Sequence, residues 1–183
     1  MLRRILFIVT VPCAAIIAFA APALASQTLT VNFDSAHAPT GTHFVTGTPQ
    51  PSCTVNATGD VTCPTQAFEL AGVGNTNATA NLSASYTATI DCRNHGGQVV
   101  ESHSQTATAT ASTGTLSPKN GRLTVPSITA PRPSNQQFLS QATCPNPNWT
   151  PEIRAGTTPT LTSFTYTVSF VGFTPGAITI TGP

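Results

Sequence analysis

The sequence predicts an all-β fold, an antiparallel β-sandwich of the Ig-like type with a long Pro-rich loop. Three observations lead to this prediction. Apolar and polar residues alternate in several segments, which is the pattern of half-buried strands. No window places apolar residues at helical spacing over three turns. Thr, Gly and Pro are abundant, and these residues favour extended chain and turns over helix. Short strands between turn signals are typical of sandwiches and barrels.

The chain begins with a predicted signal peptide over residues 1–25. Arg3 and Arg4 precede an apolar run, and Ala23-Leu24-Ala25 supplies a small-residue cleavage pattern. The alternative is an uncleaved membrane anchor, but the run is shorter than the roughly 20 residues that a span needs. We therefore expect residues 26–183 to form one secreted domain, with no membrane span after cleavage.

The first expected strand of the mature chain contains Leu29, Val31 and Phe33, which alternate with polar residues. A stretch with several Pro and Gly residues follows, and we interpret it as a loop. Phe68 and Leu70 then mark a short strand.

The strongest strand signal covers residues 79–92, where every even-numbered position is apolar and every odd-numbered position is polar. Residues 99–112 are also expected to be extended, although the alternation after Gln105 involves only Ala and Thr. Asn120-Gly121 is the preferred pair for a type I′ hairpin turn. A further short strand should follow this turn.

The Pro-rich loop is expected at residues 126–159, with one edge strand around residues 138–143. Alternation returns at residues 163–170, where four aromatic or aliphatic residues share one face and Ser and Thr share the other. Thr174-Pro175-Gly176 should turn the chain into a last strand at residues 178–180.

Four cysteines remain in the mature chain, and four cysteines allow three pairings. Geometry favours Cys53 with Cys63, because residues 57–59 then form a three-residue hairpin loop with a glycine at the left-handed position. Cys92 is left to pair with Cys144. A zinc site is the rival interpretation, but zinc sites use closely spaced cysteine pairs that this chain lacks.

Charge excludes one class of partner. Removing the two arginines of the signal peptide from the seven Lys and Arg leaves five basic residues against six acidic ones, a net charge of −1. Binding to nucleic acid requires a clustered basic surface that displaces counterions from phosphates. Five dispersed cations cannot build that surface, so we expect no nucleic-acid partner.

The sequence contains no recognisable catalytic or metal-binding motif. Nucleophile-elbow, metalloprotease and phosphate-loop patterns are all missing from it. The four histidines have no spacing that aims two of them at one ion; they are His37, His43, His95 and His103. We therefore expect no catalytic residues, metal or cofactor, and a hydrolase with an unrecognised site remains an alternative.

Trp149 is the one tryptophan of the chain, and it lies in a Pro- and Asn-rich segment beside Cys144. Exported β-sandwiches often bind carbohydrate through exposed aromatic side chains. The alternative function is therefore a polysaccharide-binding module, with Trp149, Asn148 and Arg154 as the candidate ligand contacts.

A short motif adds a resemblance. Residues 86–97 read Tyr-x5-Cys-x-Asn-x-Gly-Gly, and they are followed by Pro-Lys-Asn-Gly-Arg at residues 118–122 and by Cys144-Pro145. This combination resembles small exported proteins of actinobacteria that have no assigned function, and it covers about half of the chain. Gln98 stands where this resemblance leads us to expect Asn. The resemblance implies an exported, disulfide-containing β-domain of a bacterium and carries over no catalytic residue.

Taken together, these observations predict a non-catalytic interaction domain at the cell surface or in the medium. Its partner would be a protein or a cell-wall polysaccharide. A long Thr-rich edge strand, such as the one expected at residues 106–112, offers unpaired backbone groups with which another chain could pair.

Overall fold

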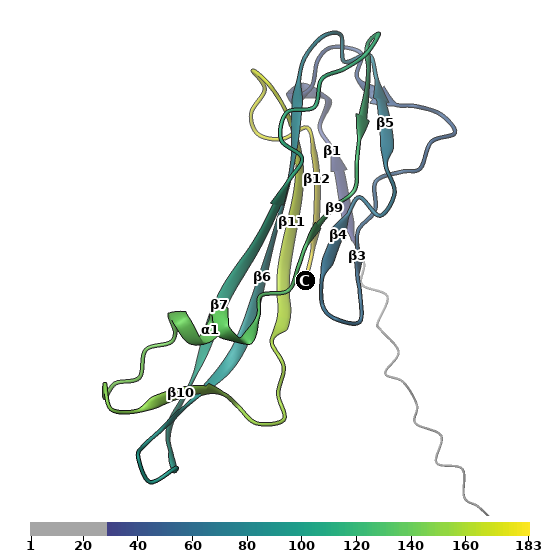
Figure 1. Ribbon diagram of the computed structural model, residues 1–183. Helices are drawn as coiled ribbons and strands as arrows, with labels where there is room; N and C mark the ends of the chain where they lie inside the picture. Colours follow the sequence, from purple (N-terminus) through teal and green to yellow (C-terminus); the bar gives the residue numbers. More distant parts are fainter. Residues whose placement is uncertain (1–28) are drawn as a thin grey trace, which may run out of the picture.

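A computed structural model describes residues 29–183 and confirms the all-β prediction (Figure 1). Its strands form three antiparallel sheets, which are not closed into a barrel, and helix is confined to two short segments. The predicted signal peptide at residues 1–25 lies outside the described residues. The sheets stack as a sandwich around one core, so the fold class follows the alternation seen in the sequence.

The largest sheet, called the long sheet below, contains the longest strands of the molecule. Its order is β1, β12, β11, β6 and β7, while β10 pairs with the part of β6 that extends beyond β11. The strands are β1 (Thr30–Phe33), β6 (Ala78–Arg93), β7 (Val99–Ser112), β10 (Thr150–Ile153), β11 (Thr160–Phe170) and β12 (Ile178–Gly182). The strands predicted around residues 79–92 and 99–112 are thus paired neighbours.

Two three-stranded sheets form the second layer. One has the order β2, β5, β8, and the other has the order β3, β4, β9. Their bounds are β2 (His43–Phe44), β5 (Phe68–Ala71), β8 (Arg122–Val125), β3 (Thr54–Val55), β4 (Val61–Cys63) and β9 (Ile128–Ala130). A single 3-10 turn, η1 (Ser35–His37), follows β1. Figure 1 shows these short strands beside one part of the long sheet, which extends well past them.

The core lies between the two layers. On β6 the even-numbered side chains from Ala78 to Cys92 are buried, as the alternation predicts. They pack with apolar side chains from the other strands, among them Phe164, Tyr166, Ile178, Ile180, Phe68, Leu70, Leu123 and Val125. Burial of large apolar side chains contributes about 1.5–3 kcal/mol each, so this inner face holds the sandwich together.

Both predicted disulfides are present. Cys53 and Cys63 lie at the base of the β3–β4 hairpin with their Cα atoms 4.5 Å apart, and Gly59 in its loop has φ +92°. Cys92 at the end of β6 is bonded to Cys144, with Cα atoms 5.9 Å apart. Disulfides of this kind are typical of extracellular proteins. The hairpin register in the sequence identified Cys53 with Cys63, and the pairing of Cys92 with Cys144 followed because only these two cysteines were left.

The predicted turn at residues 120–121 is also confirmed. Asn120 and Gly121 have φ of 51° and 72°, as a type I′ turn requires of both central residues. Lys119 and Arg122 exchange backbone hydrogen bonds of 2.7 and 3.0 Å on either side of it. The turn delivers the chain into β8, whose Leu123 is buried in the core.

The prediction of one edge strand at residues 138–143 is wrong, because a helix, α1 (Asn135–Gln141), occupies this segment. Ser134 and Gln137 form a capping box that satisfies free backbone groups at the helix start. Phe138 is fully buried against the core and holds the helix in place. A seven-residue helix is too short to show a periodic signal. The same Pro-rich stretch also contains β9 and β10, where we expected loop.

Within residues 29–183, no helix is long and apolar enough to cross a membrane.

Candidate functional site

The three residues proposed from the sequence as ligand contacts lie at the two ends of β10. Trp149 precedes the strand, is half-buried, and donates its backbone N–H to the Asn146 carbonyl at 3.0 Å. Asn148 is exposed beside it. The close ring pairs among the described residues are Phe33–Phe44 and Phe44–Phe68, so Trp149 has no second ring with which to form a stacking platform there.

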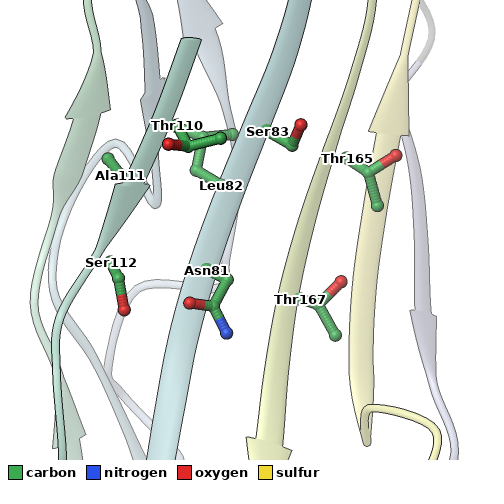
Figure 2. A pocket seen from close by; sticks show the side chains of 8 residues that line it. All are labelled: Asn81, Leu82, Ser83, Thr110, Ala111, Ser112, Thr165 and Thr167. Carbon is green, nitrogen blue, oxygen red and sulfur yellow. The ribbon is translucent and has the colours of Figure 1, made fainter. Parts of the chain in front are cut away.

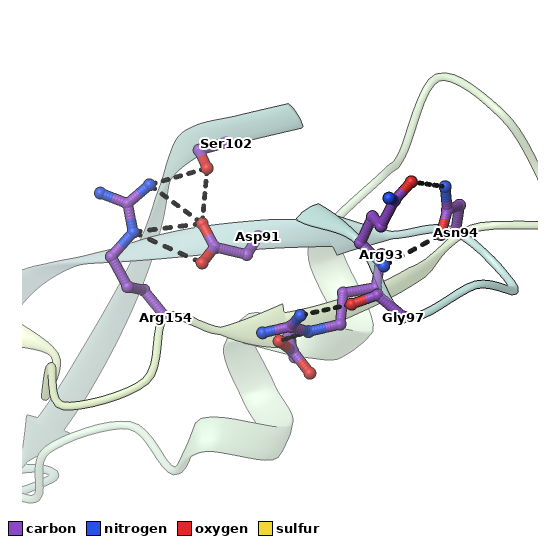
Figure 3. Close-up of polar contacts among 8 residues, drawn as sticks. Asp91, Arg93, Asn94, Gly97, Ser102 and Arg154 are labelled. Carbon is purple, nitrogen blue, oxygen red and sulfur yellow. Dashed lines mark hydrogen bonds and ion pairs between the residues drawn. The ribbon is translucent and has the colours of Figure 1, made fainter. Parts of the chain in front are cut away.

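Arg154 lies at the other end of β10 and binds within the protein. Its guanidinium donates to Asp91 at 3.1 Å and to the Ser102 hydroxyl at 2.7 Å (Figure 3). Ser102 in turn donates to the same Asp91 oxygen at 2.5 Å. The three residues therefore form a closed polar cluster that joins β6, β7 and the end of β10.

The His, Cys, Asp and Glu side chains do not gather into one site in the part of the chain that the structure describes. No group of three or more His, Cys, Asp or Glu residues there is arranged to hold a metal ion. His37 contacts Asp34 at 2.8 Å, on the exposed turn after β1. This pair caps the short 3-10 turn, because Asp34 also accepts from the Ala36 backbone N–H at 2.9 Å.

A candidate binding surface is the outer face of the long sheet. Side chains that point away from the core on the strands of this sheet are Thr, Ser or Asn, with no charged residue among them. This holds from the start of β6 to the Asp91 cluster. We call this surface the hydroxyl face; it comprises Thr30, Asn32, Thr79, Asn81, Ser83, Ser85, Thr87, Thr89, Ser104, Thr106, Thr108, Thr110, Ser112, Ser163, Thr165, Thr167, Ser169, Thr179 and Thr181.

Strand register aligns these side chains in rows across the sheet. The central row crosses all five long-sheet strands that pair in series, and every member is exposed. It consists of Thr30, Thr181, Thr165, Ser83 and Thr110. Neighbouring strands lie about 4.8 Å apart, and alternate residues of one strand lie about 6.8 Å apart. The hydroxyl face is therefore a two-dimensional array with a regular spacing in both directions.

A shallow depression lies in the middle of this array (Figure 2). Its volume is about 390 Å³, and its outward side chains come from β6, β7 and β11. Ser83, Thr110 and Thr165 form no side-chain hydrogen bond with any described residue. Each hydroxyl can both donate and accept, so the depression offers a set of free hydrogen-bonding groups to a ligand.

The two ends of the hydroxyl face are closed by different features. At one end the loop between β11 and β12 lies against the face, and a Cβ on Gly176 would meet the Thr167 methyl group at 2.0 Å. At the other end the rows reach Asp91, where the charged cluster begins (Figure 3). Arg93 lies beyond it, pairs with Glu152 and donates to the Gly97 carbonyl at 2.7 Å. The hydroxyl face itself thus carries no charged side chain, and this cluster lies at its boundary.

Hydrogen bonding controls the charge at this boundary. The Ser102 hydroxyl, and then the Arg154 guanidinium, lower the pKa of Asp91 below its usual value. Asp91 therefore stays ionised at neutral pH, and its charge is balanced by Arg154. The opposite charges of Asp91 and Arg154 cancel within the cluster. The hydroxyl face beside it contains no titratable group.

The sequence contains the signal of the hydroxyl face but does not show that its residues form one surface. The odd-numbered residues from 79 to 89 and from 163 to 169 are all Thr, Ser or Asn. In the sequence alone they indicate only the polar half of an alternating pattern. What the sequence lacks is the strand order, which places these segments side by side and aligns their hydroxyls in rows.

Comparison of the chain with protein-family models, with curated proteins and with solved structures finds no match.

Proposed function

We propose that this protein is an exported, non-catalytic binding domain whose hydroxyl face docks onto a neutral polysaccharide. The observation that carries the proposal is the charge-free array of exposed hydroxyls across the long sheet. The predicted signal peptide and the two disulfides support export. The Ig-like character predicted from the sequence suits such a role, since antibody domains of that fold serve recognition.

Chemical complementarity favours a neutral sugar polymer as the ligand. A polysaccharide presents hydroxyl groups at regular intervals, and each of them both donates and accepts hydrogen bonds, as Thr and Ser do. The Thr methyl groups add small apolar patches that suit the C–H surfaces of sugar rings. A charged polymer would lack ionic partners on this face, because the cations near it are already paired with Asp91 and Glu152.

The energetics favour an extended ligand over a small one. A hydrogen bond between neutral groups contributes only about 0.5–1.5 kcal/mol net. The depression at Ser83 and Thr165 is open and shallow, so a single sugar would make few contacts there. A polymer that crosses several rows would add many such contacts at once. We therefore infer binding to chains or to ordered polymer surfaces.

The test is a depletion assay of the mature domain against insoluble neutral polysaccharides, such as cellulose and chitin, and purified cell-wall fractions. We expect binding to at least one of them. The variant Thr165→Lys should abolish that binding, because it places a charge in the middle of the array. The bound fraction should change little between low and high salt, since screening acts only on charges.

The matched control is Thr54→Lys, on an exposed position of β3 in the opposite layer. It introduces the same charge on a strand away from the hydroxyl face and should bind as the wild type does. The variant Trp149→Ala, measured in the same assay, tests whether the Trp149 loop binds the ligand instead. Loss of binding with Trp149→Ala, together with full binding by Thr165→Lys, would contradict the proposal and assign the ligand to the Trp149 loop.

A further inference from the structure

β7 is the longest edge strand in the described molecule; α1 and β9 also contact it. It contains 14 residues, whereas β1 at the opposite edge of the long sheet contains four. An average strand has about 5–6 residues, and natural edge strands are commonly shortened, charged or interrupted by proline to prevent pairing. β7 contains no Pro, Lys or Arg. Its only acidic residue is Glu101 near its start.

The backbone of β7 has free hydrogen-bonding groups along this edge. Thr113, just past the strand, donates its N–H to the Ala80 carbonyl at 3.0 Å, and the register is continuous from there back to Glu101. In an antiparallel strand, the backbone N–H and C=O groups of one residue bond to the partner strand, and those of the next residue point away from it. The backbone groups of the odd-numbered residues of β7 thus bond to β6. Those of the even-numbered residues point away from β6, toward the free edge of the sheet.

The backbone N–H and C=O groups at this free edge form no backbone hydrogen bond with another described segment. The Thr106 carbonyl instead accepts a bond of 3.2 Å from the side chain of its own neighbour, Gln105. A side chain that turns back to its own strand in this way is what an unpaired edge carbonyl is expected to attract.

The sequence of β7 is complementary to itself in antiparallel pairing. On its inner side the first half carries long side chains, Glu101, His103 and Gln105, and the second half carries alanines. If two copies pair with Thr106 opposite Thr106, each long side chain faces an alanine of the other copy. On the hydroxyl face the same register places Ser and Thr opposite Thr, which is a favourable cross-strand pair.

We propose that β7 pairs with β7 of a second copy of this chain, antiparallel and centred on Thr106, to form a symmetric dimer with one continuous long sheet. Twofold pairing uses the same surface of both copies, as closed dimers require. The two hydroxyl faces become one surface of twice the width. This inference rests on the edge of β7 alone and does not depend on what the hydroxyl face binds.

The first test is sedimentation of the mature domain and of Thr106→Pro. The Thr106 N–H points away from β6, so proline there removes no hydrogen bond within the chain. We expect the wild type to sediment as a dimer and Thr106→Pro as a folded monomer with an unchanged circular dichroism spectrum. A wild type that stays monomeric at all concentrations would overturn the proposal.

The second test does not depend on how well the proline variant folds. In the proposed register the two Thr106 Cα atoms lie about 5.5 Å apart, which is within disulfide range. Thr106→Cys should therefore form a covalent dimer under mild oxidation. Thr110→Cys is the matched control, since its two copies would be about 27 Å apart. Equal crosslinking of the two variants would overturn the register and the proposed dimer.

Discussion

The inner and outer faces of the long sheet come from the same strands, yet their side chains differ in chemistry and in burial. On β6 the even-numbered residues are buried and apolar, whereas the odd-numbered residues up to Thr89 are hydroxyl or amide side chains that face outward. The inner face contributes the burial that stabilises the sandwich. The outer face buries little and has free hydrogen-bonding groups. Side chains that stabilise the core and side chains that are free to contact a ligand therefore alternate residue by residue along one strand.

The largest expected effect comes from substitutions of adjacent residues on β6. Leu82→Ala removes a fully packed side chain from the core and should lower the free energy of unfolding by about 3 kcal/mol. Ser83→Ala, one position further on the hydroxyl face, should change it by less than about 0.5 kcal/mol. Urea unfolding followed by circular dichroism measures both. Equal destabilisation by the two variants would show that the outer face contributes to stability as much as the inner face does.

A second pair of variants compares two tyrosines of the inner face. The Tyr86 hydroxyl donates to the Gly59 carbonyl at 2.8 Å and connects β6 to the loop of the β3–β4 hairpin. The Tyr166 hydroxyl is buried with no hydrogen-bond partner among the described residues. Burial raises the pKa of both phenols, so both are neutral.

Tyr86→Phe should therefore lower the free energy of unfolding by about 1 kcal/mol, because it leaves the Gly59 carbonyl without its donor. Tyr166→Phe should leave it unchanged or raise it, because the variant removes an unsatisfied polar atom. Thermal unfolding of the two variants side by side is the measurement. A reversed order of stability would contradict the assigned hydrogen bonds.

The smallest expected effect concerns pH. Hydrogen bonds hold the pKa values of Asp34, Asp60 and Asp91 below their usual range, chiefly from His37, from the Arg132 backbone N–H and from Ser102 respectively. A folded-state pKa that is lowered adds stability above the unfolded-state value of about 4, and this stability is lost as the pH falls through the folded-state value. The free energy of unfolding should thus be constant near neutral pH and fall in acid.

Asp91→Asn should weaken this acid dependence without affecting the proposed binding of polysaccharide between about pH 5 and 8, because the hydroxyl face has no titratable group. Urea unfolding at a series of pH values, with a binding assay at each, checks both statements. An unchanged acid dependence in the variant would show that Asp91 does not contribute to it.

The sequence predicted the parts of the fold that depend on local chemistry. Alternation along residues 79–92 and 163–170 located β6 and β11, and Gly59 and Asn120-Gly121 located two turns. The disulfide pairs followed because cysteines in one hairpin leave only the remaining two to pair. The Ig-like topology and the signal peptide remain predictions.

Features that depend on contacts distant in sequence were not predicted. Helix α1 is held by the burial of Phe138 and by a capping box, neither of which produces an extended pattern. The role of Arg154 as the partner of Asp91 depends on β10 pairing with β6. The hydroxyl face likewise depends on strand order, since Thr110, Ser83 and Thr165 come from three separate segments.

The measurement that tests the central claim most directly is a joint measurement of binding and stability on the triple variant Thr110→Val, Thr165→Val and Thr181→Val. Valine keeps the shape of threonine and favours strands, so the fold should be retained. The control is the triple variant Thr54→Val, Thr124→Val and Thr129→Val, at exposed strand positions of the opposite layer.

We predict that the first variant unfolds at the wild-type urea midpoint and binds neutral polysaccharide about a hundredfold more weakly, because three hydrogen bonds of about 1 kcal/mol each are lost. The control variant should match the wild type in affinity. Wild-type affinity in both variants, or an equal loss of affinity in both, would contradict the assignment of binding to the hydroxyl face.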